Sequence, residues 1–254
     1  MSGHSKWHSI RHKKAIVDAK RGKAFTRLLK EVTMAARLGG GDQHFNPRLR
    51  LAVEKAKNGN VPRDNIDRAI KKGTGDLPGF RLEEASYEGF AAGGVAVFVQ
   101  AATDNRNRTV SDVRHLFSKY GGNLGESGSV NWMFEKAGQF LVPKDQASED
   151  DLIDLVLSSG GSDVLEDGEH WDLRCPPEAF AAVRDALGSS GIQCDSEEIA
   201  MIATQHVQVA GGEAQRVLRL MEALEDQEDV TGVWANFDMD DDELDDDELD
   251  AAAS

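Results

Sequence analysis

Residues 95–134, VAVFVQAATDNRNRTVSDVRHLFSKYGGNLGESGSVNWMF, hold the pattern that decides the fold class. Val95–Val99 is an apolar run rich in β-branched residues, which predicts a strand. From Arg108 to Lys119 the apolar residues recur at helical spacing and two glycines follow, which predicts a helix that ends there. Ser129–Phe134 is predicted as a second strand. Together the three segments form a β-α-β unit, which indicates a sheet with a helix packed on it.

The alternation of strands and helices continues to residue 237. Units this short favour the split β-α-β-β-α-β pattern over a doubly wound sheet. The segments on either side of 136–204 supply one helix each, and such a domain needs two. We therefore predict that 136–204 is an α+β domain inserted into another built from 81–135 and 205–240. Further strands are predicted at 139–142, 170–174, 200–204, 206–209 and 230–237, and helices at 151–157, 177–187 and 213–224.

Residues 1–80 are expected to form a basic helical domain. Apolar residues between 20 and 38 recur at helical spacing, and the glycines at 39–41 end that helix. Asn46-Pro47 predicts the N-cap and first residue of a second helix, and a third begins near Pro62. The fold class is thus α+β, with a helical N-terminal domain and two ferredoxin-like α+β domains, one inserted in the other.

Charge is divided unevenly along the chain. The net charge is −16, yet residues 1–75 carry 18 Lys and Arg against 6 Asp and Glu, a net charge of +12. The remainder therefore carries −28, and residues 238–254 contain ten acidic and no basic residues. A block of like charges repels itself, so 241–254 is predicted to be a disordered acidic tail. A basic domain joined to an acidic body is typical of a protein that binds phosphate with one end.

Composition places the chain among cytoplasmic globular proteins. Its 254 residues, 40% of them hydrophobic, suffice to bury a core without metal or disulfide staples. No apolar run nears the ~20 residues that a membrane helix needs, and the polar first residues do not resemble a secretory signal. Cys175 and Cys194 indicate buried thiols in a reducing compartment. No membrane partner is expected, and the sequence leaves the oligomeric state open.

The candidate nucleic-acid site is the basic N-terminal segment. Neutralising phosphates with release of counterions needs a dense cluster of cations, and this segment has no carboxylate before Asp18. A solvated helix face is the alternative interpretation. Trp7 suits base stacking, although anchoring or core packing explains it equally well. The residues predicted to bind nucleic acid here are Lys6, Trp7, Arg11, His12, Lys13, Lys14, Lys20, Arg21, Lys23, Arg27 and Lys30.

A second candidate is the loop Asp104–Thr109, which follows a predicted strand and precedes a predicted helix. Backbone donors at a helix N-terminus, together with Arg106 and Arg108, could hold an anion such as a nucleic-acid phosphate. Simple capping of the helix by Asn107 or its neighbours is the alternative.

No metal, cofactor or catalytic activity is expected. His4, His8 and His12 would share one face of a helix, but neighbouring serines favour a non-helical segment in which the histidines contact phosphate. The sequence shows no phosphate-binding loop of the GxxxxGK[ST] type and no nucleophile elbow. An enzyme acting on nucleic acid remains an alternative, and it would need metal-binding carboxylates clustered within 81–240.

Several motifs together resemble the YebC family. The resemblance covers residues 1 to about 240, and the chain departs from the family mainly in its long acidic tail. The motifs are Gly3-His4-Ser5-Lys6-Trp7, Asp18-Ala19-Lys20-Arg21-Gly22-Lys23, Asn46-Pro47-Arg48-Leu49-Arg50, Pro62-Arg63-Asp64-Asn65-Ile66-Asp67-Arg68-Ala69-Ile70-Lys71-Lys72-Gly73, Asp104-Asn105-Arg106-Asn107-Arg108-Thr109, Gly128-Ser129-Val130-Asn131-Trp132-Met133-Phe134 and Trp234-Ala235-Asn236-Phe237.

The resemblance implies a three-domain, crescent-like α+β protein with a helical N-terminal domain. Bacterial members are usually named probable transcriptional regulators that bind DNA, so the first expectation is a DNA-binding transcriptional regulator. Mitochondrial relatives are described as translational activators of cytochrome c oxidase, and some bacterial members as ribosome-associated factors that assist synthesis of proline-rich peptides. The expected partner is thus DNA, or alternatively ribosomal or transfer RNA within the ribosome.

The residues themselves do not rank these two targets strongly. An acidic body is unfavourable for wrapping DNA, and no predicted helix carries an evident base-reading set. A ribosomal site would need only local positive charge and recognition of RNA shape.

Overall fold

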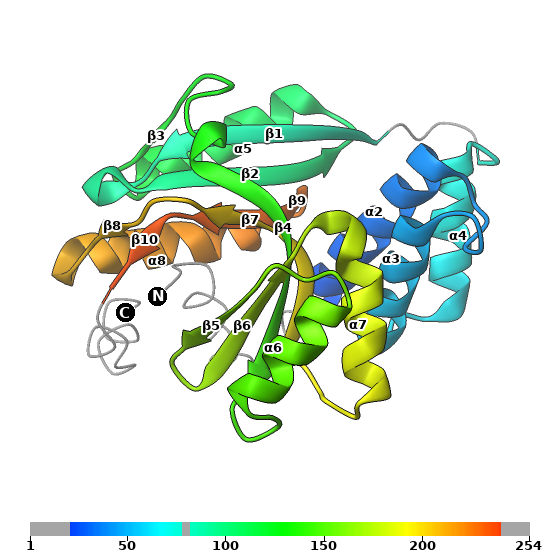
Figure 1. Ribbon diagram of the computed structural model, residues 1–254. Helices are drawn as coiled ribbons and strands as arrows, with labels where there is room; N and C mark the ends of the chain where they lie inside the picture. Colours follow the sequence, from blue (N-terminus) through cyan, green and yellow to red (C-terminus); the bar gives the residue numbers. More distant parts are fainter. Residues whose placement is uncertain (1–20, 78–81, 240–254) are drawn as a thin grey trace.

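The computed structural model describes residues 21–77 and 82–239, with side chains from residue 25 onward. In Figure 1 the N-terminal helices lie at one end of the molecule, and sheets with helices packed on them form the remainder. This arrangement confirms the α+β class and the helical N-terminal domain. The predicted acidic tail, 241–254, lies outside the described residues. No helix in the described part is long and apolar enough to cross a membrane.

The N-terminal domain consists of α2 (Arg21–Gly39), α3 (Pro47–Asn58) and α4 (Arg63–Thr74). Asn46 caps α3, because its side-chain oxygen accepts a hydrogen bond from the Leu49 amide at 3.0 Å. The apolar stripes of the helices meet in one core that contains Val32, Leu49 and Ile66. The predictions of three helices and of the Asn46-Pro47 helix start are confirmed.

Gly73 allows α2 and α4 to cross closely. A Cβ atom at Gly73 would lie 2.3 Å from the Thr33 carbonyl oxygen and 2.7 Å from Ala36 Cβ, both on α2. The first of these neighbours is backbone, which cannot rotate away as a flexible side chain can. Only a residue without a side chain is compatible with this crossing.

Gly73→Ala is therefore expected to lower the free energy of unfolding by about 2 kcal/mol, because the two helices must move apart. Urea denaturation followed by circular dichroism measures the change. Gly188→Ala in α7 (Phe180–Ser189) is the matched control, because open space surrounds Gly188. There the gain in helix propensity should raise stability by a few tenths of a kcal/mol up to about 1 kcal/mol. Equal effects at the two positions would contradict the close crossing.

The first sheet is built from two separate segments of the chain, and the segment between them forms the second sheet. Its strands are β1 (Glu83–Phe90), β2 (Ala96–Thr103), β3 (Asn123–Leu124) and β9 (Val230–Ala235), in the order β3-β1-β2-β9 with antiparallel neighbours. The helices α5 (Arg106–Lys119) and α8 (Gly211–Glu225) pack on one face, where Val97 and Val99 meet Phe117 and Met221. The strand β1 was not predicted, because its stretch EEASYEGF has three glutamates and no clear alternation.

The second sheet is formed by one continuous segment. Its order along the chain is β4 (Phe134–Pro143), α6 (Glu149–Ser158), β5 (Asp163–Asp167), β6 (His170–Cys175), α7 (Phe180–Ser189) and β7 (Ser196–Ala203). This is the β-α-β-β-α-β pattern, with strand order β5-β6-β4-β7. Phe134 pairs with Ala203, so the segment begins and ends at one place. The strand β5 was not predicted.

Short elements complete the fold. The strands β8 (Val207–Gln208) and β10 (Phe237–Asp238) pair in parallel. Single 3-10 turns occupy η2 (Ala92–Gly94), η3 (Asn131–Met133) and η4 (Pro177–Ala179).

The predicted strand at Ser129–Phe134 is wrong. These residues form a turn followed by η3, and β4 begins only at Phe134. The buried carboxylate of Glu88 in β1 accepts hydrogen bonds from the backbone amides of Gly128, Val130 and Asn131, each at 2.8 Å. Amide groups held by this side chain cannot pair with a neighbouring strand, so the apolar residues of the stretch fold into a compact loop instead.

The two sheets pack against each other through the face of the first sheet that its helices leave open. Ala96, Phe98 and Trp234 on this face meet Phe134 and Ile202 at the edge of the second sheet. Both faces of β2 are consequently buried, which explains why Val95–Val99 is continuously apolar.

Candidate nucleic-acid interface

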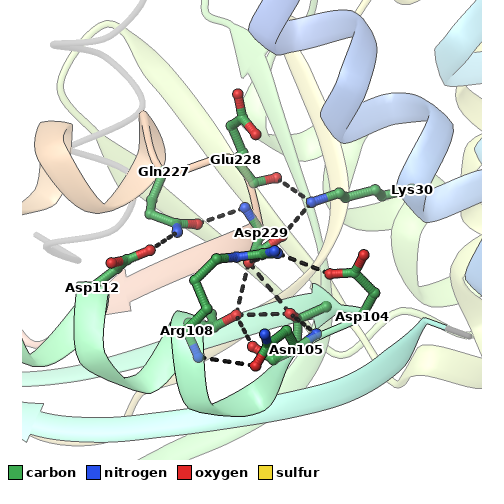
Figure 2. A network of polar contacts seen from close by, with 10 residues as sticks. Lys30, Asp104, Asn105, Arg108, Asp112, Gln227, Glu228 and Asp229 are labelled. Carbon is green, nitrogen blue, oxygen red and sulfur yellow. Dashed lines mark hydrogen bonds and ion pairs between the residues drawn. The ribbon is translucent and has the colours of Figure 1, made fainter.

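Asp229 connects three segments that lie far apart in the sequence. Its carboxylate accepts hydrogen bonds from Lys30 of α2 at 2.5 Å, from Arg108 of α5 at 3.0 Å and from the Thr109 hydroxyl at 2.7 Å. Figure 2 shows the cation of Lys30 and the guanidinium of Arg108 converging on this carboxylate. We call Lys30, Arg108, Thr109 and Asp229 the Asp229 cluster. It joins the N-terminal domain to the first sheet.

The carboxylate of Asp229 is charged in the folded protein. Burial by itself raises its pKa, but the hydrogen bonds from Lys30, Thr109 and Arg108 outweigh burial and lower the pKa to about 2. The side chain of Asp229 is only 3% exposed and that of Lys30 only 14%. Such a pair is shielded from salt far better than a surface ion pair.

Arg27 and Lys30 are predicted from the sequence to bind nucleic acid. The structure instead turns both toward the first sheet. Arg27 donates through Nε and Nη2 to the Thr231 carbonyl oxygen, at 2.9 and 2.6 Å, and Lys30 also donates to the Glu228 carbonyl oxygen at 2.8 Å. A phosphate could reach Lys30 only by competing with Asp229, so in this conformation these two cations serve domain docking.

Arg106 and Arg108, the predicted anion-binding pair, lie on the first turn of α5. Arg108 bonds both Asp229 and Asp104, and these hydrogen bonds raise its pKa. Arg106 donates to the Glu84 carbonyl oxygen and pairs with Glu83. The cap of α5 is Asn105, whose side-chain oxygen accepts from the Arg108 amide, and not Asn107. Both arginines thus already have carboxylate partners, although about half of each side chain remains exposed.

The N-terminal domain also contacts the inserted segment. Arg184 of α7 pairs with Glu54 of α3 at 2.7 Å, and Leu51 packs against the core of the second sheet. The helical domain therefore touches both sheets, through α2 on one side and α3 on the other.

The other predicted binding residues cannot be placed. Lys6, Trp7, Arg11, His12, Lys13, Lys14 and Lys20 lie outside the described residues, as do the side chains of Arg21 and Lys23. His4 and His8 also lie outside them. Within the described part, no three His, Cys, Asp or Glu side chains come together in a way that could hold a metal ion.

The exposed surface of the described N-terminal domain carries more cations than carboxylates. Between residues 25 and 77 the exposed cations are Arg37, Arg48, Arg50, Lys57, Arg63, Arg68 and Lys71, and the exposed carboxylates are Asp42, Asp64, Asp67 and Asp76. The exposed surface of the described N-terminal domain thus has a net positive charge, although Arg48 lies toward β1, where it pairs with Glu84.

The two cysteines differ in exposure, because Cys175 is buried as predicted and Cys194 is only partly buried. Burial raises the pKa of Cys175 to about 11 and that of Cys194 to about 12, so both are thiols at neutral pH.

Comparison with known families matches both parts of this architecture. Residues 5–76 match the TACO1/YebC protein N-terminal domain, and residues 82–237 match the TACO1/YebC second and third domain. The chain belongs to the TACO1/YebC family. A solved structure of a conserved hypothetical protein from Aquifex aeolicus aligns with a TM-score of 0.81 at 46% identity, and the match covers 89% of this chain and 94% of that one.

Curated relatives extend over nearly the whole TACO1/YebC chain. A probable transcriptional regulatory protein of Koribacter versatilis is 52% identical over 96% of this chain and 98% of its own length. One from Acidobacterium capsulatum is 53% identical over 94% of this chain and 97% of its own length. Their names describe regulators of gene expression.

The residues that organise this region could not be found from local sequence patterns. Asp229 lies in an acidic stretch of ordinary appearance, and Glu88 lies in a strand that was not predicted. Neither carboxylate gives a local signal of its partners, because those partners are 40 or more positions away for Glu88 and 120 or more for Asp229.

Proposed function

We propose that this TACO1/YebC chain is a non-catalytic, cytoplasmic regulator of gene expression that binds nucleic acid through its N-terminal domain. The observation that carries the proposal is the separation of charge, +12 over residues 1–75 and −28 over the remainder. The described part of the domain exposes seven cations and four carboxylates, so its surface keeps an excess of positive charge. An electrostatic contact of this kind supplies most of the sequence-independent affinity for a nucleic-acid backbone.

Binding to DNA in the control of transcription is the first candidate, because the curated relatives are named probable transcriptional regulatory proteins. A ribosome-associated translation factor is the second candidate, and the acidic body favours it. A net charge of −28 repels a long duplex beyond the bound site, whereas a factor inserted at one RNA site needs only local positive charge.

The deciding experiment follows the endogenous protein through sucrose gradients over a series of salt concentrations, in parallel with binding of purified protein to duplex DNA of varied sequence. Salt-sensitive sedimentation with ribosomes, together with weak and sequence-indifferent DNA binding, supports the translation factor. Tight, sequence-dependent DNA binding without ribosome association supports the transcriptional regulator. Binding to neither would contradict the proposal as a whole.

Changing Lys13, Lys14, Lys20 and Lys23 together to alanine is expected to weaken binding at least tenfold at every sequence tested. The slope of log K against log salt concentration should flatten by about 0.9 for each duplex phosphate that the protein no longer neutralises. Fluorescence anisotropy over a salt series measures both.

The matched control removes four exposed cations from the acidic body, namely Arg114, Lys119, Lys136 and Arg216. Both variants change the net charge by the same amount, so an equal loss of affinity would show that total charge and not the N-terminal segment determines binding.

A further inference from the structure

The connection between α2 and α3 exposes apolar surface. Four large hydrophobic side chains lie exposed in the described part of the chain, and two of them lie here: Leu38 at 59%, in the last turn of α2, and Phe45 at 80%, in the connection itself. We call residues 40–46 the Phe45 loop. Single exposed apolar residues are common on protein surfaces, so exposure alone assigns no function. Two further features of this loop do.

The first feature is that the Phe45 loop is held in one conformation. Asn46 is buried and donates through Nδ2 to the carbonyl oxygens of Ala35 and Gly40, each at 2.8 Å. Arg50 donates to the carbonyl oxygens of Gln43 and His44, at 3.1 and 3.0 Å. These hydrogen bonds hold the loop at both ends. Phe45 is therefore exposed on a loop that is well bonded.

The loop also lies against a second helix. A Cβ atom at Gly41 would be 2.9 Å from a methyl carbon of Thr74 and 3.2 Å from one of Ile70, both near the end of α4. Gly40 has φ +83°, a left-handed conformation that glycine adopts without strain. The rings of His44 and Phe45 meet edge to face, with centroids 4.9 Å apart. The Phe45 ring is thus presented to solvent on a fixed support.

The second feature is the charge around the ring. The loop lies among the end of α2, the start of α3 and the end of α4, and these contribute Arg37, Arg50 and Lys71, all exposed, whereas Arg48 of α3 pairs with Glu84 of β1. Asp42 is the acidic residue within the loop, and its carboxylate accepts a hydrogen bond from the His44 amide. An exposed aromatic ring with exposed cations on the adjoining helices complements an unpaired base with its flanking phosphates.

From this geometry we infer that the Phe45 loop is a binding site for a single-stranded segment of nucleic acid, with one base stacked on Phe45 and its phosphates near Arg37 and Lys71. The inference rests on the proposed function and specifies the form of nucleic acid that this domain recognises. A paired base is already stacked on both faces within its duplex, so it is not available to the ring. Unpaired RNA and unpaired DNA share the recognised chemistry.

The test uses the full chain and labelled single strands of RNA and DNA about 12 nucleotides long, within the range that one single-strand-binding site covers, with the matching duplexes as further probes. Phe45→Ala is expected to weaken single-strand binding about tenfold, since stacking on an aromatic side chain contributes on this scale. Phe45→Trp should retain or strengthen binding, and Phe45→Leu, which is apolar but not aromatic, should resemble Phe45→Ala. Duplex binding should change less than twofold. Because Phe45 is largely exposed, all three variants should keep the parent melting temperature.

An abasic strand of the same length isolates the stacking contact. The abasic strand keeps the phosphates and lacks the bases. Phe45→Ala should therefore bind the abasic strand as tightly as the parent protein binds it. Trp132→Ala is the matched control, because Trp132 is also an exposed aromatic residue, at 64%. In the sequence, however, it lies between Glu126 and Glu135. It should leave single-strand affinity unchanged.

The outcomes separate the two proposals. If the parent protein binds none of the probes, the proposed function fails. If it binds single strands and Phe45→Ala binds them equally well, only the inference fails. The inference is also overturned if Phe45→Ala weakens abasic-strand or duplex binding as much as single-strand binding, or if Trp132→Ala has the same effect. Preference for the RNA strand over the DNA strand, or the reverse, identifies the source of the segment.

Discussion

Asp229→Asn is expected to lower the free energy of unfolding by about 3 kcal/mol, because it removes one partner from a buried ion pair. The amide keeps the shape of the carboxylate, but it leaves the cations of Lys30 and Arg108 facing a neutral group. The contact between the N-terminal domain and the first sheet should weaken at the same time. Chemical denaturation measures the first effect, and proteolysis within residues 74–82 measures the second.

Asp104→Asn is the control for Asp229→Asn. Asp104 pairs with the same arginine, at 2.9 Å, but its side chain is 46% exposed. An exposed pair contributes at most about 1 kcal/mol, so this variant should remain close to the parent. Similar losses in both variants would mean that Asp229 is no more important than a surface charge.

Asp229→Asn is also expected to change how the free energy of unfolding depends on pH in acid. The pKa of Asp229 is about 2 in the folded protein, below its ordinary value of 3.8. A depressed pKa gives stability that is complete above the unfolded value and is lost as the pH falls toward the folded value. The parent should therefore lose about 2 kcal/mol between pH 4 and pH 2 that Asp229→Asn does not lose. Parallel stability curves in this range would contradict the low pKa.

Glu88→Ala is expected to cost about 3 kcal/mol and to release the loop before β4. The variant leaves the amides of Gly128, Val130 and Asn131 without the acceptor that each has at 2.8 Å. A buried amide that loses its partner costs roughly 1–3 kcal/mol, and water entering the opened loop offsets part of the total. Hydrogen exchange across residues 125–133 should rise sharply, while exchange in α6 and β6 stays unchanged.

Glu88→Gln and Glu84→Ala are the control variants for Glu88→Ala. Glu88→Gln keeps one oxygen acceptor and should lie between the parent and Glu88→Ala. Glu84→Ala removes a carboxylate from the same strand that is 49% exposed and paired with Arg48, and it should cost less than about 1 kcal/mol. Unchanged exchange in residues 125–133 of Glu88→Ala would show that the loop holds itself without the carboxylate.

Periodic elements could be predicted from the sequence, and elements defined by distant partners could not. The helices α2, α3, α5 and α8 have one apolar stripe each, so local spacing was sufficient. The strand β1 was missed because its charged residues are accommodated by specific contacts, among them the buried bonds of Glu88. Ser129–Phe134 was predicted as a strand because its apolar content gives no sign that a carboxylate 40 or more positions earlier holds its amides.

In the candidate site, too, local features could be predicted and contacts between distant residues could not. The charge of residues 1–75 was evident from the sequence, and the family followed from local motifs. The destination of individual cations was not evident, because Lys30 and its partner Asp229 are 199 positions apart. Charge density predicts where a domain is basic, but tertiary contacts determine which cations remain available to a partner.

The position of β9 in the first sheet sets an order for folding during synthesis. Phe134 pairs with Ala203, so the inserted segment can fold as soon as it is complete. Its folding brings together the two parts of the chain that it separates. The strand β9 and Asp229 are made only afterwards, near the end of the chain. Until then the carboxylate that Lys30 binds does not exist. The N-terminal domain can therefore dock on the second sheet, through Glu54 and Leu51, before it docks on the first, and until Asp229 is made Lys30 has no carboxylate to hold it there.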